Sequence, residues 1–432
     1  MRYLIRVLSY LPIITFFVSF NQLLGQQINI PRISLMPNFP QPYEMRDWKK
    51  VAHGYDSLVF NQNIVGDYLP TVFFRNNSVN YPELPSFGLH TAIGTNSPTS
   101  GEAINIIPAI IGATLVDIDK SNQFGNNWAS MAREFFNKRP QENIYLNHPQ
   151  TNSGSDWWYE TMPNVFFMQL KNLYPEIKVF DDQLMVIANQ WMLALRGMGA
   201  SDTPWASPYM NYRAWSMSTM TPLDEGVKQP ESSGAIAWIL YNAYIVTGQK
   251  EYLKGAEWAM EFLNKWNDNP SYELQLPYGV YTAARMNAEI ATKYNIEKMV
   301  NWCFNRGNLR GWGAIVGKWG GLDCSGLIGE ANDSGNDYAF MMNGFQQAGA
   351  LVPMLRYDER FSKSIAKWVL NMANASRLFY SAYLPNNMQD NSDWSETYDP
   401  NSYIAYEALR EVKNNKRPYA TGDAMFGGWA QT

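Results

Sequence analysis

Apolar residues recur at helical spacing through most of the chain, and strand-like alternation of apolar and polar residues is scarce. The helical segments come in pairs, in which a nearly uncharged segment is followed by a short polar break and then by a charged, amphipathic segment. Five such pairs are recognisable, with first segments at 102–116, 156–173, 231–246, 273–294 and 337–357. Because a helix that is apolar all round is buried and an amphipathic one covers a surface, we predict an inner and an outer helix in every pair.

Two further helical segments, Glu44 to Phe60 and Ser402 to Val412, lie near the two ends of the chain. Pairing them closes a ring of twelve helices. The fold that we predict is therefore all-α, a toroid of six helical hairpins over residues 40–415.

The links between helices fall into two sets by length. Short links stand inside the pairs, at 117–122, 174–176, 247–250, 294–296 and 357–359. Long links stand between most pairs, at 61–101, 139–155, 198–230, 306–335 and 381–401. If all inner helices run in the same direction, the long links gather at one end of the ring, over the N-termini of the inner helices. Long loops in a compact domain are usually functional or disordered, and these are too aromatic for typical disorder.

This pattern resembles the (α/α)6 toroid, the six-hairpin fold of many carbohydrate-active enzymes. More narrowly, three stretches are similar to the helical region of secreted bacterial proteins that carry a laminin-G-like domain further on: SGSDWWYETMPNVFF, GWGAIVGKWGGLDCSGL and NDYAFMMNGF. That resemblance implies a fold and export rather than a particular chemistry. The chain stops at MFGGWAQT, so we expect either a truncated sequence or a member that lacks this module.

Composition and charge narrow the class of partner. The 432 residues carry a formal charge of −5 and contain no run of Lys or Arg, which excludes nucleic acid as a ligand. Arg2 and Arg6 precede an apolar run at 7–20, with Gly25 near a plausible cleavage point, and this pattern is typical of a signal peptide. The run is shorter than the ~20 residues that span a membrane.

We therefore expect a signal peptide over 1–26, a toroid domain over 27–415 and a C-terminal tail over 416–432. The mature protein is predicted to be secreted or periplasmic, without a membrane span. A retained N-terminal anchor is the alternative.

The chain offers few residues for metal or nucleophile chemistry. Cys303 and Cys324 are its two cysteines, and they are either buried free thiols or a disulfide. With three histidines they do not make a standard structural zinc site. G-x-S-x-G, phosphate-loop and dinucleotide-binding motifs are absent from the sequence. We predict no metal and no cofactor.

Acids stand at or near the starts of the predicted inner helices: Glu102, Asp156, Glu231, Glu273 and Asp337. The helix macrodipole alone favours acids there, by ~0.3–1 kcal/mol each. Taken together, however, they ring one end of a central cavity. Glycoside hydrolysis needs such carboxylates, because one protonates the leaving oxygen and another acts as base or nucleophile.

Asp156 is our first catalytic candidate, because it precedes Trp157, Trp158 and Tyr159. Two successive indoles cannot both face the core through one helical stripe. We predict that one packs into the wall while the other, with Tyr159, lines the cavity as a platform for a sugar ring. Indoles that desolvate Asp156 would hold it protonated as a general acid. The alternative is a helix cap beside two core indoles.

Asp333 is the second catalytic candidate, and Glu231 is the third. Asp333 lies in a Gly-rich cluster with Asp323, Glu330 and Asp337, and local turn hydrogen bonding is the alternative role for it. We predict that Asp156 and Asp333 line one cavity, roughly 5–10 Å apart, as in glycosidases. Calcium ligation by the cluster is a further alternative, although the spacing does not match an EF-hand.

The long loops supply candidates for substrate binding: His90, Trp205, Tyr212, Arg213, Trp215 and, next to the Asp333 cluster, Asp337 and Tyr338. An arginine among aromatic rings can pair with a uronate or sulfate. The alternative is that Arg213 stacks on Trp to hold its loop, and that His90 and His148 pack loops.

The function that we predict is a secreted glycan-degrading enzyme, a glycoside hydrolase that acts on a polysaccharide or oligosaccharide through two carboxylates. One alternative is a polysaccharide lyase that abstracts a proton from a uronate with Tyr338, Tyr212, His90 or His148. The other is a non-catalytic glycan-binding protein, which needs the aromatic platforms but no titrating carboxylate.

Overall fold

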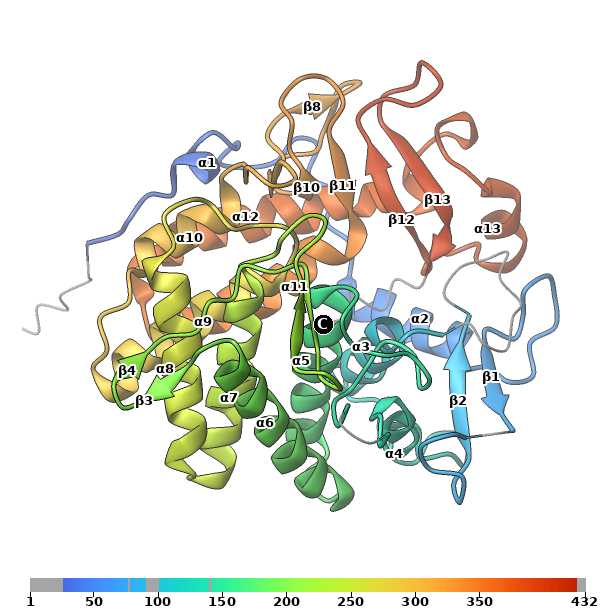
Figure 1. Ribbon diagram of the computed structural model, residues 1–432. Coiled ribbons are helices and arrows are strands. Elements are labelled where there is room, and N and C mark those ends of the chain that lie inside the picture. The colour runs from blue at the N-terminus through green and yellow to red at the C-terminus, as the bar shows by residue number, and fades with distance from the viewer. Residues whose placement is uncertain (1–25, 77, 91–100, 140–141, 426–432) are drawn as a thin grey trace, which may run out of the picture.

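The computed structural model describes residues 26–76, 78–90, 101–139 and 142–425, and it confirms a mostly helical toroid (Figure 1). Five nearly uncharged helices form the inner ring: α3 (Ala103–Leu115), α5 (Trp157–Leu173), α7 (Ser232–Thr247), α9 (Gln275–Ile290) and α11 (Met341–Met354). Each packs against the next inner helix along the chain. The predicted inner helices are therefore confirmed, with ends that differ by a few residues.

Helices α7 and α9 approach most closely at two glycines. A Cβ atom added to Gly279 would lie 2.7 Å from the Cα atom of Gly234, which is closer than real Cβ contacts. The inner ring can close at this point only because neither residue carries a side chain.

Outer helices cover the inner ring. They are α4 (Trp128–Met131) with the 3-10 turn η1 (Ala132–Phe135), α6 (Val179–Gly197), α8 (Lys250–Lys265), α10 (Ile296–Phe304) and α12 (Ser362–Ala375). The first of these is much shorter than predicted. Its chain leaves the helix at Phe136, which forms a β-bridge with Tyr145 instead.

Of the two helices predicted for the sixth hairpin, one forms and the other is replaced by a strand. Helix α2 (Trp48–Val59) forms and packs against α3. The helix predicted at Ser402–Val412 is wrong, because these residues contain strand β12 (Ala405–Arg410), which packs on α11. A register shift between Tyr406 and Ala408 breaks the alternation of the strand, so its buried positions recur every three residues. That spacing imitates a helix in the sequence.

Strand β12 belongs to a five-stranded antiparallel sheet in the order β13-β12-β11-β10-β7. The other members are β7 (Trp312–Ala314), β10 (Ile328–Glu330), β11 (Tyr338–Phe340) and β13 (Tyr419–Met425). Figure 1 shows β10 to β13 beside the N-terminal part of α11. Because β13 pairs with β12 along its length, residues predicted to be a tail contribute an edge strand.

Short elements organise the remaining loops. They include the strand pairs β1–β2 (Val72–Arg75, Ser86–Leu89), β3–β4 (Ser201–Asp202, Trp205–Ala206), β5–β6 (Ala214–Ser216, Thr221–Leu223) and β8–β9 (Lys318–Trp319, Leu322–Asp323). The short helices are α1 (Pro31–Ser34), α13 (Ser392–Tyr398) and the 3-10 turns η2 (Glu359–Phe361), η3 (Ser376–Phe379), η4 (Ser381–Tyr383) and η5 (Asn386–Met388).

Three other expectations concern the ends and the cysteines. The predicted signal peptide lies outside the described residues, apart from its last position. Cys303 and Cys324 are buried free thiols. Among the helices that the structure describes, none is long and apolar enough to cross a membrane.

A buried ion pair ties α2 to the link between α3 and α4. The Lys120 ammonium group lies 2.7 Å from the Asp56 carboxylate and 3.0 Å from the ring centre of Phe60. Gln123 donates a second hydrogen bond to Asp56, at 2.5 Å. Burial lowers the pKa of Lys120 to about 8, and Asp56 opposes this shift.

Replacing Asp56 by Asn is expected to lower the free energy of unfolding by about 3–5 kcal/mol, because the variant leaves a buried ammonium group without its anion. Asp117→Asn is the matched control. It removes the anion of the exposed Lys49–Asp117 pair and is expected to leave stability unchanged. Guanidinium unfolding measures both variants, and equal stabilities for D56N and D117N would contradict a structural role for the buried pair.

Candidate functional site

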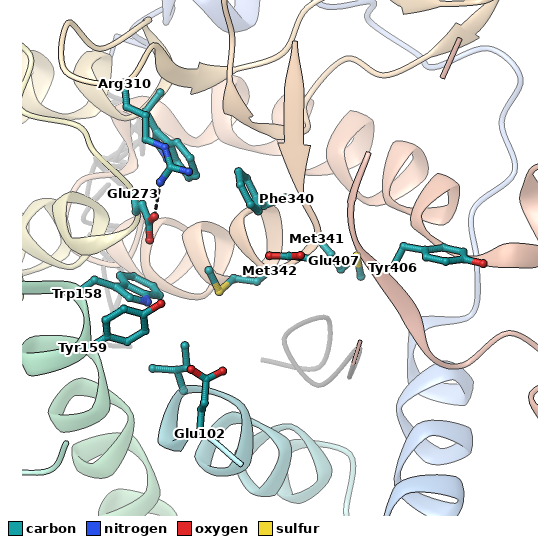
Figure 2. A pocket seen from close by; sticks show the side chains of 12 residues that line it. Glu102, Trp158, Tyr159, Glu273, Arg310, Phe340, Met341, Met342, Tyr406 and Glu407 are labelled. Atoms are coloured by element: carbon teal, nitrogen blue, oxygen red, sulfur yellow. Dashed lines mark hydrogen bonds and ion pairs between the residues drawn. The ribbon is translucent and has the colours of Figure 1, made fainter. Parts of the chain in front are cut away.

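A cavity of about 270 Å³ opens near the N-terminal ends of four inner helices, α3, α5, α9 and α11 (Figure 2). Its lining residues come from α3, α5, the chain before α9, the loop before β7, the junction of β11 with α11, and β12. They are Glu102, Ile104, Trp158, Tyr159, Glu273, Arg310, Trp312, Phe340, Met341, Met342, Tyr406 and Glu407. The cavity therefore combines acids, aromatic rings and one guanidinium group.

Three carboxylates from separate parts of the chain share this cavity. Glu102 precedes α3, Glu273 lies two residues before α9, and Glu407 lies on β12. In Figure 2 all three side chains point toward the same space. This convergence of acids is what hydrolysis of a glycosidic bond requires.

Amide groups orient the carboxylate of Glu102. Asn147 donates to its Oε1 atom at 2.6 Å, and Asn105 donates to its Oε2 atom at 3.3 Å. The imidazole of His148 lies 4.0 Å away. Although Glu102 stands at the N-cap position of α3, its side chain makes no capping hydrogen bond. Both carboxylate oxygens of Glu102 are therefore bound by side-chain amides and not by the backbone of the first helical turn.

Glu273 is paired with Arg310, whose Nη1 atom contacts the carboxylate (Figure 2). The Nε atom of Arg310 donates to Glu330 at 2.7 Å, so one guanidinium group bridges two acids. Burial raises the pKa of Glu273 to about 7, and Arg310 opposes this shift. The side chain keeps 17% of its surface exposed. Glu273 is thus a carboxyl group that can hold and release a proton near neutral pH.

The two indoles of the WWY sequence face opposite ways. Trp157 is fully buried and stacks on Trp191 in the wall, with ring centres 6.0 Å apart. Trp158 and Tyr159 line the cavity, and Tyr159 is 40% exposed. Burial, followed by the charges of nearby acids, raises the pKa of Tyr159 to about 12, so its phenol stays protonated at neutral pH.

Glu160 holds the loop that precedes these aromatic residues. Its Oε1 atom accepts hydrogen bonds from the backbone N–H groups of Gly154, Ser155 and Asp156 at 2.6, 2.8 and 3.1 Å. Its Oε2 atom accepts from the N–H group of Trp215 at 3.2 Å. Burial raises the pKa of Glu160 to about 8, and the four N–H donors oppose this shift. One buried acid therefore joins two long loops behind the cavity.

Asp156, our first catalytic candidate, caps α5 and pairs with an arginine. Its Oδ1 atom accepts from the backbone N–H of Trp158 at 3.0 Å and from Gln229 at 2.8 Å. Its Oδ2 atom contacts the guanidinium group of Arg213. The lining of the cavity does not include Asp156. These partners favour the helix-cap alternative over a catalytic role for Asp156.

Asp333 pairs with an arginine of α1, and Asp337 supports the backbone of the same loop. Asp333 forms a two-pronged pair with Arg32, at 2.7 and 2.8 Å, and its side chain is 43% exposed. Asp337 is buried and accepts the backbone N–H of Asp333 at 2.8 Å. Burial raises the pKa of Asp337. The lining of the cavity described here contains neither Asp156 nor Asp333.

Glu231 is buried behind the cavity and supports the start of α9. Its carboxylate accepts the backbone N–H groups of Glu273 at 2.8 Å and Leu276 at 3.4 Å. Burial raises the pKa of Glu231 to about 7. Glu231 therefore positions the backbone of Glu273 and does not itself reach the cavity.

The other binding candidates lie outside the cavity lining. Arg213 pairs with Asp156, and Trp205 donates its indole N–H to Glu261 at 2.9 Å. Tyr212 packs near Trp215. His90 is buried near the ring of Phe73, and the guanidinium group of Arg410 lies over the ring of Tyr338. The contacts of His90 agree with its loop-packing alternative, whereas Arg213 pairs with Asp156 and lies over the ring of Tyr272 rather than stacking on Trp.

Two of the three cavity acids were recognised in the sequence but were not chosen as catalytic candidates. Glu102 and Glu273 belong to the predicted ring of helix-start acids. No sequence feature other than its place in a long loop marked Arg310 as a residue of the site. Glu407 fell in a segment assigned to the wrong secondary structure, so its direction was not predictable.

The site offers no obvious metal centre. Within the described ranges, no group of three or more His, Cys, Asp or Glu side chains is arranged to hold a metal ion. The calcium alternative for the Asp333 cluster thus gains no support.

Comparisons with known proteins leave the chemistry open. No protein-family model and no curated protein matches the sequence. Among solved structures, a mutant of unsaturated glucuronyl hydrolase from Streptococcus agalactiae aligns with 94% of this chain and 90% of its own, at 12% sequence identity and a TM-score of 0.46. A likeness of this degree carries no argument about the reaction, which has to be inferred from the cavity itself.

Above about pH 8, where the Glu160 carboxyl group is ionised, replacing Glu160 by Gln is expected to lower the free energy of unfolding by about 1–3 kcal/mol. The amide group would turn N–H donors toward N–H donors and leave at least one of them without an acceptor. Glu176→Gln, at an exposed position, is the matched control and is expected to have no effect. Chemical denaturation of both variants provides the comparison. Wild-type stability in E160Q would show that the loops do not depend on this acid.

Proposed function

We propose that this chain is an exported glycan-degrading enzyme, a glycoside hydrolase that uses carboxylates of the cavity described above. The observation that supports the proposal is the convergence of Glu102, Glu273 and Glu407 on one cavity, beside the rings of Trp158 and Tyr159. Aromatic rings can pack against the apolar C–H face of a sugar, and paired carboxylates supply the acid and the base or nucleophile.

Glu273 is proposed as the general acid. Its pKa of about 7 lets it carry a transferable proton at neutral pH, and its carboxyl group reaches the cavity surface. This assignment replaces Asp156 and Asp333, which have partners elsewhere.

Glu407 is proposed as the base or nucleophile, because it is the most exposed of the three acids and can meet water or the anomeric carbon. Glu102 is held by two amide donors, so we propose that it orients hydroxyl groups of the bound sugar.

The lyase alternative has less support from the cavity. A lyase must neutralise the uronate carboxylate and remove a proton with an ionisable base. Arg310 is already paired with two acids, and the phenol of Tyr159 stays protonated at neutral pH. The lyase bases considered from the sequence, Tyr338, Tyr212, His90 and His148, lie outside the lining.

Replacing Glu273 by Gln is expected to reduce turnover by about 10²–10⁴-fold, because the amide cannot donate a proton to the leaving oxygen. In the wild type, kcat/KM is expected to fall as the pH rises through about 7, where Glu273 loses its proton. This alkaline limb is expected to disappear in E273Q. The substrate for these assays comes from a glycan panel read for new reducing ends and for ultraviolet absorbance.

Glu330→Gln is the matched control, because it removes the other acid bound to Arg310 without entering the cavity. It is expected to keep most of its turnover and to shift the alkaline limb to lower pH, since the charge of Arg310 then acts on Glu273 alone. An unchanged pH profile in E273Q would contradict the assignment. Ultraviolet-absorbing products would favour a lyase, and binding without turnover a glycan-binding protein.

Export is part of the proposal and has its own test. The basic start and apolar run of residues 1–26 support a cleaved signal peptide. N-terminal sequencing of the protein collected outside the cytoplasm is expected to give a mature start near residue 26. Recovery of the full-length chain from the membrane fraction would argue for a retained anchor instead.

A further inference from the structure

The charges that line the cavity are unequal in number. Among its described lining residues, three are acids and one, Arg310, is a cation. The Nη1 and Nε atoms of Arg310 are bound to Glu273 and Glu330. The carboxylate of Glu330 already balances this guanidinium group, and Glu273 adds a second negative charge when it is ionised, so Arg310 offers no net positive charge to a ligand.

Neighbouring basic groups do not offset the excess of negative charge in the cavity. Arg213 is paired with Asp156 and contacts the hydroxyl group of Tyr272 at 3.4 Å, outside the lining. His148 lies 4.0 Å from Glu102, also outside the lining. Among the described residues, an acidic sugar would therefore meet no cation that is not already paired with a carboxylate.

The pKa of Tyr159 reflects the charges that surround the cavity. After burial, the effects that raise the pKa of this phenol are the negative charges of Glu102, Glu273, Asp156 and Glu407. All four act in the same direction. The platform on which a sugar ring would rest thus lies in a negative potential.

We infer that the cavity selects sugar units without carboxylate or sulfate groups, and that a free amino group on the bound sugar strengthens binding. This inference rests on the proposed glycan-degrading function and names its substrate class. A uronate or sulfate would bring a further negative charge into a partly dehydrated space that already holds the carboxylates of Glu102 and Glu407, and that of Glu273 when it is ionised, where like charges repel more strongly than in bulk water. An ammonium group would instead be attracted by these carboxylates.

Matched sugar series test the inference. The methyl glycosides of glucose, glucuronic acid and glucosamine differ mainly in charge, and the galactose and mannose series repeat the comparison. Titration calorimetry is expected to show the neutral sugar binding at least about tenfold more tightly than the uronate, and the amino sugar more tightly still. Added salt is expected to reduce both differences.

Two variants assign the selectivity to the cavity. Glu407→Gln removes one lining charge and is expected to reduce the ratio of neutral-sugar to uronate affinity by about fivefold. Glu176→Gln removes one charge from an exposed position elsewhere and is expected to leave the ratio unchanged. An equal ratio in E407Q and wild type would overturn the inference.

The outcomes separate this inference from the proposed function. Tighter binding of uronates, or turnover of an acidic unit in the glycan panel, overturns the inference while glycan degradation stands. Turnover of a neutral or aminated unit supports both. If no sugar binds and no glycan is cleaved, the proposed function fails, and the inference fails with it.

Discussion

Buried carboxylates that accept backbone N–H groups from the long loops are the interaction on which the rest of the structure depends. Glu134 and Glu160 each bind three or more such groups, while Glu231 binds two at the start of α9 and Asp399 binds two just before β12. An N–H group that is buried without an acceptor costs ~1–3 kcal/mol, so loops of this length need partners supplied by the helices or by the loops themselves. These acids fix the loops against the helical ring, and the fixed loops and strands give the cavity its walls.

The acids consequently fall into two groups, those that bind backbone N–H groups and those that line the cavity. Glu160 and Glu231 are spent on backbone donors behind the cavity, whereas Glu273 and Glu407 face into it. A sequence shows that acids stand at helix starts but not which way each side chain turns. Asp156 illustrates the limit, because its place before two indoles was informative about Trp157 and Trp158, while its own partner, Arg213, comes from a distant loop.

The fold was more predictable than the site. The five inner helices and four of their outer partners follow from apolar and charged periodicity alone, whereas the outer partner of α3 is much shorter than predicted. The segment at Ser402–Val412 failed because a bulge gives strand β12 a helical spacing of buried positions. Because of that error, Glu407 was not recognised as a residue of the cavity. The direction of a side chain on a strand depends on pairing with β11 and β13, and local sequence does not encode it.

The central claim is that a cavity carboxyl group, Glu273, holds a proton near neutral pH while the acids behind it fix its position. Infrared difference spectra between wild type and E273Q, recorded across pH, follow the protonated carboxyl group of this residue directly, without a substrate. The account predicts a protonated-carboxyl band that is present in the wild type, absent in E273Q, and lost with a midpoint near pH 7. A Glu273 carboxyl group that is already fully ionised at about pH 5, close to ordinary glutamate behaviour, would contradict it.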